Sequence, residues 1–66
     1  MKVTINGQIK DISNAANIAD IVGQFCANKK HIITEVNGTL VPRDDWNKTS
    51  LKEGDAIELV SFVGGG

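Results

Sequence analysis

The 66-residue chain has few of the Cys and His residues that many enzymes use for catalysis and many very small domains use for disulfides or metal sites. Its one Cys (Cys26) and one His (His31) are too few for an internal disulfide and poor material for a structural zinc site. No apolar stretch approaches the roughly 20 residues of a membrane span, and Met1-Lys2 leads directly into alternating residues without a signal-peptide core. We therefore expect an unprocessed cytoplasmic protein whose lone thiol stays reduced.

An excess of charge of one sign is also missing. Seven Lys and Arg residues against eight Asp and Glu residues give a formal net charge of -1, and like charges form no long run. Nucleic acid and anionic membrane are therefore not expected as partners. The length allows one small domain, and 41% hydrophobic with 23% charged residues is typical of a chain that folds.

Two Asn-Gly dipeptides indicate two hairpins. Lys2 to Asn6 alternates polar and apolar residues, and the Asn6-Gly7 turn predicts a return strand over Gln8 to Ile12. The inward phase of that strand is open, because Ile9 and Ile12 cannot share one face of a regular strand.

The second hairpin follows the same logic. It is predicted to join a β-branched strand over Ile32–Val36 to Thr39–Val41 through Asn37-Gly38. Pro42 lacks an amide donor and should end the second strand or lie at a sheet edge.

The apolar spacing between the hairpins predicts a helix. The residues on its apolar face are Ile18, Ile21, Val22, Phe25 and Cys26. Asn17 is a good N-cap, with Asp20 completing a relaxed capping box, and Asn28 can take the left-handed conformation after the last turn.

A polar segment with Trp46 should form a surface or helical turn, and Lys52 to Asp55 a further turn before the last strand over Ala56–Val63. This order of elements predicts an α+β fold of the ubiquitin-like β-grasp type, a mixed sheet of four to five strands covered by one helix. Residues 1–63 would form one domain, and residues 64–66 a flexible tail.

The last strand presents apolar residues to both faces of the predicted sheet. Ile57, Leu59 and Val63 would pack under the helix, which directs Val60 and Phe62 to the opposite face. Either the segment around Trp46 shields these two side chains, or they form a docking surface for a partner.

Most catalytic arrangements are disfavoured. Cys26 is in phase with the apolar helix face, where a thiol is usually an inert small hydrophobe, and His31 lies near the helix end. The adjacent carboxylates of Asp44 and Asp45 suit a solvated turn. Arg43 either covers Trp46 or anchors a partner with it.

The tail Gly64-Gly65-Gly66 is chemically distinctive because it has no side chains and ends in an α-carboxylate. Such a segment can enter a narrow enzyme channel. Its carboxylate, with a pKa near 3.5, is ionised at pH 7 and needs activation, for example as an acyl-adenylate, before a nucleophile can attack. The chain would then be a substrate and carrier; alternatively, the three glycines are an ordinary frayed end.

Residues spread over the whole chain resemble one known family. They are Asn6-Gly7, Asn17 through Val22, Val36-Asn37-Gly38, Val41-Pro42-Arg43 with Trp46, Leu51, Gly54-Asp55, Ile57-Glu58 and the Gly-Gly end. Together they look like the ThiS family, the sulfur carriers of thiamine biosynthesis. The Gly-Gly end is shared with the molybdopterin synthase small subunit and ubiquitin-like modifiers, whereas the Val-Pro-Arg segment with Trp46 favours the thiamine branch. Asn17 stands where the family usually has Thr.

The resemblance implies a non-enzymatic role. An adenylating enzyme using ATP and Mg²⁺ would activate the Gly66 carboxylate, a persulfide donor would convert it to a thiocarboxylate, and thiazole synthase would take the sulfur. Gly64 and Gly65 would thread into the partner, and Val60 and Phe62 fall on the family's partner-facing surface. The chain would bind no cofactor or metal itself. A carrier for molybdopterin or tRNA thiolation, and a ubiquitin-like interaction module with an idle tail, are the alternatives.

Overall fold

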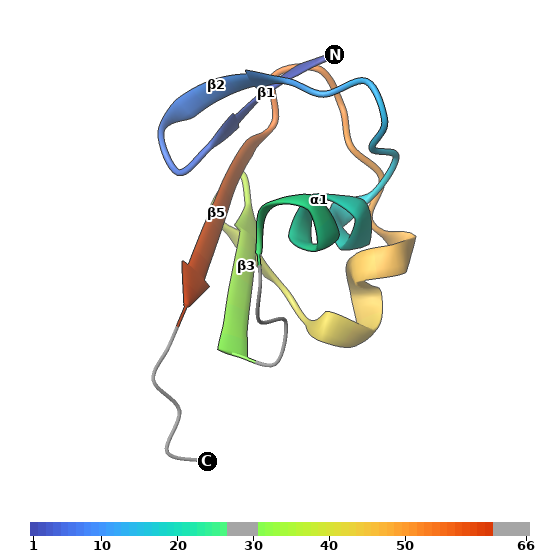
Figure 1. The fold of residues 1–66 in the computed structure, drawn as a ribbon. Helices are drawn as coiled ribbons and strands as arrows, with labels where there is room; N and C mark the ends of the chain where they lie inside the picture. Colours follow the sequence, from blue (N-terminus) through green and yellow to red (C-terminus); the bar gives the residue numbers. More distant parts are fainter. Residues whose placement is uncertain (27–30, 62–66) are drawn as a thin grey trace.

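The structure, a computed structural model, describes residues 1–26 and 31–61 (Figure 1). The elements are β1 (Lys2–Ile5), β2 (Gln8–Asp11), α1 (Ile18–Phe25), β3 (Ile32–Val36), β4 (Thr39–Val41), the 3-10 helix η2 (Arg43–Lys48) and β5 (Ala56–Ser61). One five-stranded sheet has the order β2-β1-β5-β3-β4, and α1 and η2 lie on the same side of it (Figure 1). The predicted mixed sheet covered by one helix is confirmed.

The last strand occupies the centre of the sheet. β5 runs parallel to β1, with Thr4 opposite Ala56, and antiparallel to β3, with Val36 opposite Ile57. The β1/β2 and β3/β4 hairpins are both antiparallel and flank β5 on its two sides. The first and last strands of the chain are therefore neighbours, and β5 joins the two hairpins into one sheet.

Both Asn-Gly dipeptides form the predicted turns. Asn6 and Gly7 have φ values of 50° and 82°, and Asn37 and Gly38 have φ values of 52° and 83°. Two consecutive residues with positive φ are typical of a type I′ turn, whose twist matches that of the flanking strands. Asn tolerates this conformation better than other non-glycine residues, which explains its place before each Gly.

The side chains of the two turn asparagines bind the central strand. Asn6 Oδ1 accepts a hydrogen bond from Leu59 N at 2.8 Å, and Asn6 Nδ2 donates to Leu59 O at 3.2 Å. On the other side, Asn37 Oδ1 accepts from Ala56 N at 2.9 Å, and Asn37 Nδ2 donates to Asp55 Oδ1 at 3.0 Å. Each amide thus extends the hydrogen-bonding of a flanking hairpin onto β5.

The N-terminus of α1 forms as its capping residues predict. The Asn17 side chain accepts from Asp20 N at 3.0 Å, and the Asp20 carboxylate accepts from Asn17 N at 3.2 Å, which completes the capping box. Ile18, Ile21 and Val22 are fully buried against the sheet. A helix of eight residues is only marginally stable alone, so packing against the sheet stabilises α1.

The C-terminal end of α1 differs from the prediction. The helix ends at Phe25, whose side chain is 42% exposed, and Cys26 is an extended C-cap residue that packs half-buried against the core. Full burial of the apolar face therefore ends at Val22, and in the last turn of the helix Phe25 is exposed while Cys26 is half-buried. The expected left-handed cap at Asn28 lies outside the described residues.

The polar segment after β4 is held by its one aromatic residue. Pro42 follows β4 at the sheet edge, as predicted, and η2 begins at Arg43. Trp46 is buried, and its Nε1–H donates to Val41 O at 3.1 Å. The Arg43 guanidinium lies 5.2 Å from the centroid of the indole ring, so Arg43 does cover Trp46.

The register with β1 resolves the open phase of the second strand. β2 ends at Asp11, but Ile12 N donates to Met1 O at 2.8 Å, which continues the β1/β2 pairing by one residue. Ile12 lies on the core side and is buried, whereas Ile9 lies on the other face and is 75% exposed.

Replacing Asn6 separates the two contributions of this residue. Asn6→Gly keeps the positive φ and removes both side-chain bonds to Leu59, so we expect a loss of about 1–3 kcal/mol in unfolding free energy. Asn6→Ala adds a strained backbone and should lose about 1 kcal/mol more. Urea denaturation measures both; equal stabilities of wild type and Asn6→Gly would mean that the amide bonds contribute nothing.

Candidate functional site

The alternation of β5 gives the end of this strand two different surfaces. Ile57 and Leu59 are buried in the core, as predicted. Val60 points to the opposite face and is 51% exposed. The other members of the predicted pattern, Phe62 and Val63, lie outside the described residues, as does the tail 64–66.

The segment around Trp46 leaves Val60 uncovered. Trp46 belongs to the core cluster, and η2 contacts α1 on the helix side of the sheet (Figure 1). The exposure of Val60 on the other side excludes the shielding alternative for this residue.

Val60 is part of an apolar patch on the uncovered face of the sheet. Ile33 is its partner in the β3/β5 register and is 38% exposed, and Leu40 of β4 is 57% exposed. We call Ile33, Leu40 and Val60 the open-face patch. A contiguous patch of exposed aliphatic side chains on three adjacent strands is typical of a protein-docking surface.

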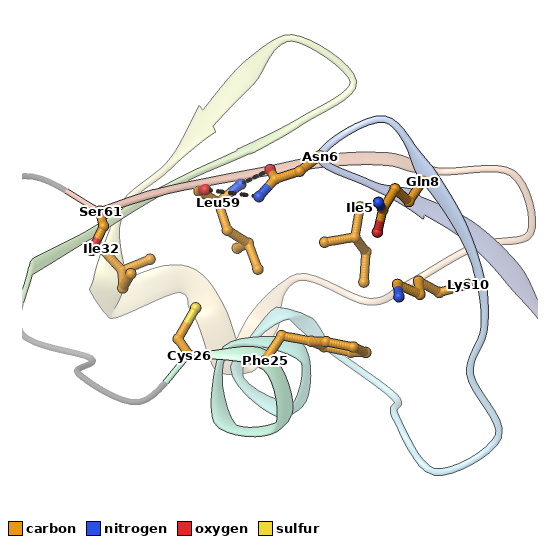
Figure 2. Close-up of a pocket in the computed structure, with 9 residues that line it drawn as sticks. All are labelled: Ile5, Asn6, Gln8, Lys10, Phe25, Cys26, Ile32, Leu59 and Ser61. Atoms are coloured by element: carbon orange, nitrogen blue, oxygen red, sulfur yellow. Dashed lines mark hydrogen bonds between the residues drawn. The ribbon is translucent and has the colours of Figure 1, made fainter.

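A groove of about 490 Å³ lies on the helix side of the sheet (Figure 2). It is lined by Ile5, Asn6, Gln8, Lys10, Phe25, Cys26, Ile32, Leu59 and Ser61. Figure 2 shows Ile5 and Leu59 pointing from the strands toward the helix that carries Phe25, with Lys10 at the right-hand end of the groove. The groove therefore has an apolar floor and, among its described lining residues, one cationic group.

The Cys26 thiol lines this groove, yet its environment disfavours nucleophilic chemistry. Burial raises the pKa of the Cys26 thiol above its ordinary value, because the thiolate is poorly solvated there. A thiol of raised pKa is mostly protonated at neutral pH and reacts slowly. His31 is half-buried just before β3.

The remaining residues considered from the sequence lie away from β5. Asp44 and Asp45 are exposed in the first turn of η2, as expected of a solvated turn. Among the described residues, no helix is long and apolar enough to cross a membrane.

Known proteins resemble this chain over nearly its whole length. The ThiS family profile matches residues 3–66. The chain belongs to the ThiS family. The crystal structure of the thiamine biosynthesis protein ThiS from Geobacter metallireducens superimposes with a TM-score of 0.86 at 30% identity, covering 100% of both chains.

Two curated proteins are similar to this chain in sequence. The sulfur carrier protein ThiS of Bacillus subtilis (strain 168) is 30% identical over 63 residues, which cover 94% of this chain and 96% of the relative. A thiazole synthase of Paramagnetospirillum magneticum (strain ATCC 700264 / AMB-1) is 29% identical over 66 residues. That match covers 100% of this chain but only 20% of the thiazole synthase.

These matches confirm the expected class of protein. The chain is a ThiS-family sulfur carrier of thiamine biosynthesis with the β-grasp fold, and it is a carrier rather than an enzyme.

Sequence reasoning missed the groove, because it placed Phe25 in the core. The end of the buried helix face at Val22 is visible only once the helix is set against the sheet.

Alkylation of Cys26 tests its assigned inertness. Because burial raises the pKa of the thiol, the native chain at pH 8 should react with iodoacetamide more slowly than glutathione does. The reaction is followed by intact mass, with the urea-unfolded chain as the control that restores the rate. A native rate above that of glutathione would identify Cys26 as an activated thiol.

Proposed function

We propose that the chain carries sulfur as a thiocarboxylate at Gly66 and delivers it for construction of the thiazole ring of thiamine. The family match carries this proposal, because it runs through the Gly-Gly-Gly end to residue 66. The fold supports it because β5, the strand that precedes that end in the sequence, lies in the middle of the sheet and is hydrogen-bonded by side chains from both hairpin turns.

The terminal carboxylate must be activated before it can accept sulfur. A carboxylate oxygen attacks the α-phosphorus of ATP, pyrophosphate leaves, and an acyl-adenylate results. The terminal sulfur of a persulfide then attacks the carbonyl carbon and expels AMP, and a thiol cleaves the S–S bond of the acyl disulfide to leave the thiocarboxylate. ATP and Mg²⁺ belong to the adenylating partner in this scheme, and the chain contributes the acyl group.

The proposed roles divide between the tail and the face of the sheet. Gly64 and Gly65 thread into the partner's channel, since the absence of Cβ atoms lets another backbone approach closely. Val60 and Phe62 form the docking surface, and the exposed Val60 side chain supports this part. In this proposal the uncovered face of the sheet is the docking surface, and residues 64–66 are the flexible carrier segment.

The proposed partners are an adenylating enzyme related to ubiquitin-activating enzymes, a persulfide donor and thiazole synthase. The likeness between this chain and a fifth of the Paramagnetospirillum thiazole synthase supports the last of these. The unpaired Cys26 fits a reducing cytosol as the compartment.

Sulfur loading is directly visible in the intact mass. Incubation with the cognate adenylating enzyme, ATP, Mg²⁺ and a persulfide donor should exchange one oxygen of the chain for one sulfur. Cys26→Ser should leave the exchange intact, because the acceptor is the terminal carboxylate. Deletion of Gly66 should abolish it, because the shortened tail no longer brings that carboxylate to the partner's reaction centre. An unchanged wild-type mass with a partner that loads its own carrier would refute the proposal.

The docking role of Val60 can be tested against a matched position. Val60→Asp should lower kcat/KM for adenylation by about tenfold or more, since it places a charge within an apolar contact. Ile9→Asp introduces the same charge at an exposed isoleucine on the edge strand β2, away from the open-face patch, and should have little effect. Equal losses from the two variants would remove Val60 from the docking surface.

A further inference from the structure

Two carboxylates lie opposite each other on the uncovered face of the sheet. The β3/β5 register pairs Glu35 with Glu58. The backbone bond from Asn37 N to Ala56 O sets the phase, so that Glu35 and Glu58 are a hydrogen-bonded pair with Cα atoms about 5.5 Å apart. Neither carboxylate forms an ion pair or hydrogen bond within the described ranges 1–26 and 31–61.

The neighbours of this acidic pair in the sheet register are apolar, and Arg43, which lines a pocket with Ile33 and Leu40, lies over the Trp46 ring. Val60 follows Glu58 on the same face, Ile33 lies opposite Val60, and Leu40 lies opposite Glu35. Like charges directly opposite each other destabilise a sheet. The free domain therefore holds an uncompensated pair of negative charges within the open-face patch, and a cation brought by a partner would offset it.

We propose that the acidic pair Glu35/Glu58 receives an arginine side chain of the adenylating enzyme when the open-face patch docks; this rests on the function proposed above. Two carboxylates on adjacent strands can share the N–H groups of one planar guanidinium. The guanidinium is also weakly hydrated, so it enters an apolar patch more readily than an ammonium group does. Charge complementarity thus selects an arginine-bearing, otherwise apolar partner surface.

Binding of the full chain to the cognate adenylating enzyme, measured by calorimetry, tests the pair. Glu35→Gln and Glu58→Gln should each weaken binding by about fivefold or more. Asp44→Asn removes an equal charge from exposed η2 and should change binding less than about twofold. The urea midpoints of the two glutamine variants should rise above that of wild type, because the repulsion is relieved. Affinities equal to that of Asp44→Asn would overturn the proposal.

Charge reversal identifies the partner group. Glu58→Arg should lose binding, and one Arg→Glu variant among the surface arginines of the adenylating enzyme should restore it. Restoration only by a lysine variant, or by none, would overturn the assignment to arginine. Failure of wild type to gain sulfur would instead refute the proposed function. Normal loading together with unchanged binding of both glutamine variants would refute the acidic pair alone.

Discussion

The structure depends on the pairing of its last strand, β5, with the two hairpins that precede it in the sequence. β5 gains one parallel and one antiparallel neighbour, and at each side a turn asparagine adds two side-chain bonds, Asn6 to Leu59 and Asn37 to Ala56 and Asp55. These bonds fix the translation of β5 along the sheet. A shift by one residue would exchange Leu59 and Val60 between core and surface, so the same bonds decide which of the two side chains is exposed.

Local patterns predicted much of this fold. The Asn-Gly turns, the capping box of Asn17 and Asp20, and the alternation of β5 each depend on residues close in sequence, and the structure shows all three. What could not be predicted depends on the meeting of distant segments. Phe25 has the right helical spacing for the core, but it lies in the last turn of the helix and lines a groove. Opposition of Glu35 and Glu58 requires the register between β3 and β5, which no local pattern contains.

The candidate site shows the same division. The proposed carrier end stays a prediction from local chemistry, a carboxylate preceded by glycines. The surfaces of the sheet could not be predicted in this way, since each is assembled from several strands. Leu59 and Ser61 contribute to a groove on the helix side, whereas Val60 joins Ile33 and Leu40 on the other. One strand thereby contributes to two distinct surfaces, one on each face of the sheet.

The central position of β5 also bears on how the protein is made. Until residues 56–61 have left the ribosome, the two hairpins have no strand between them, and β1 and β3 each lack a neighbour. Local hairpins and α1 can form early, but the sheet cannot close during synthesis of the first fifty residues or so. Prematurely terminated chains therefore remain open to proteolysis. Any copy that completes the sheet has been translated through Ser61, so a closed sheet requires a chain that carries all five strands.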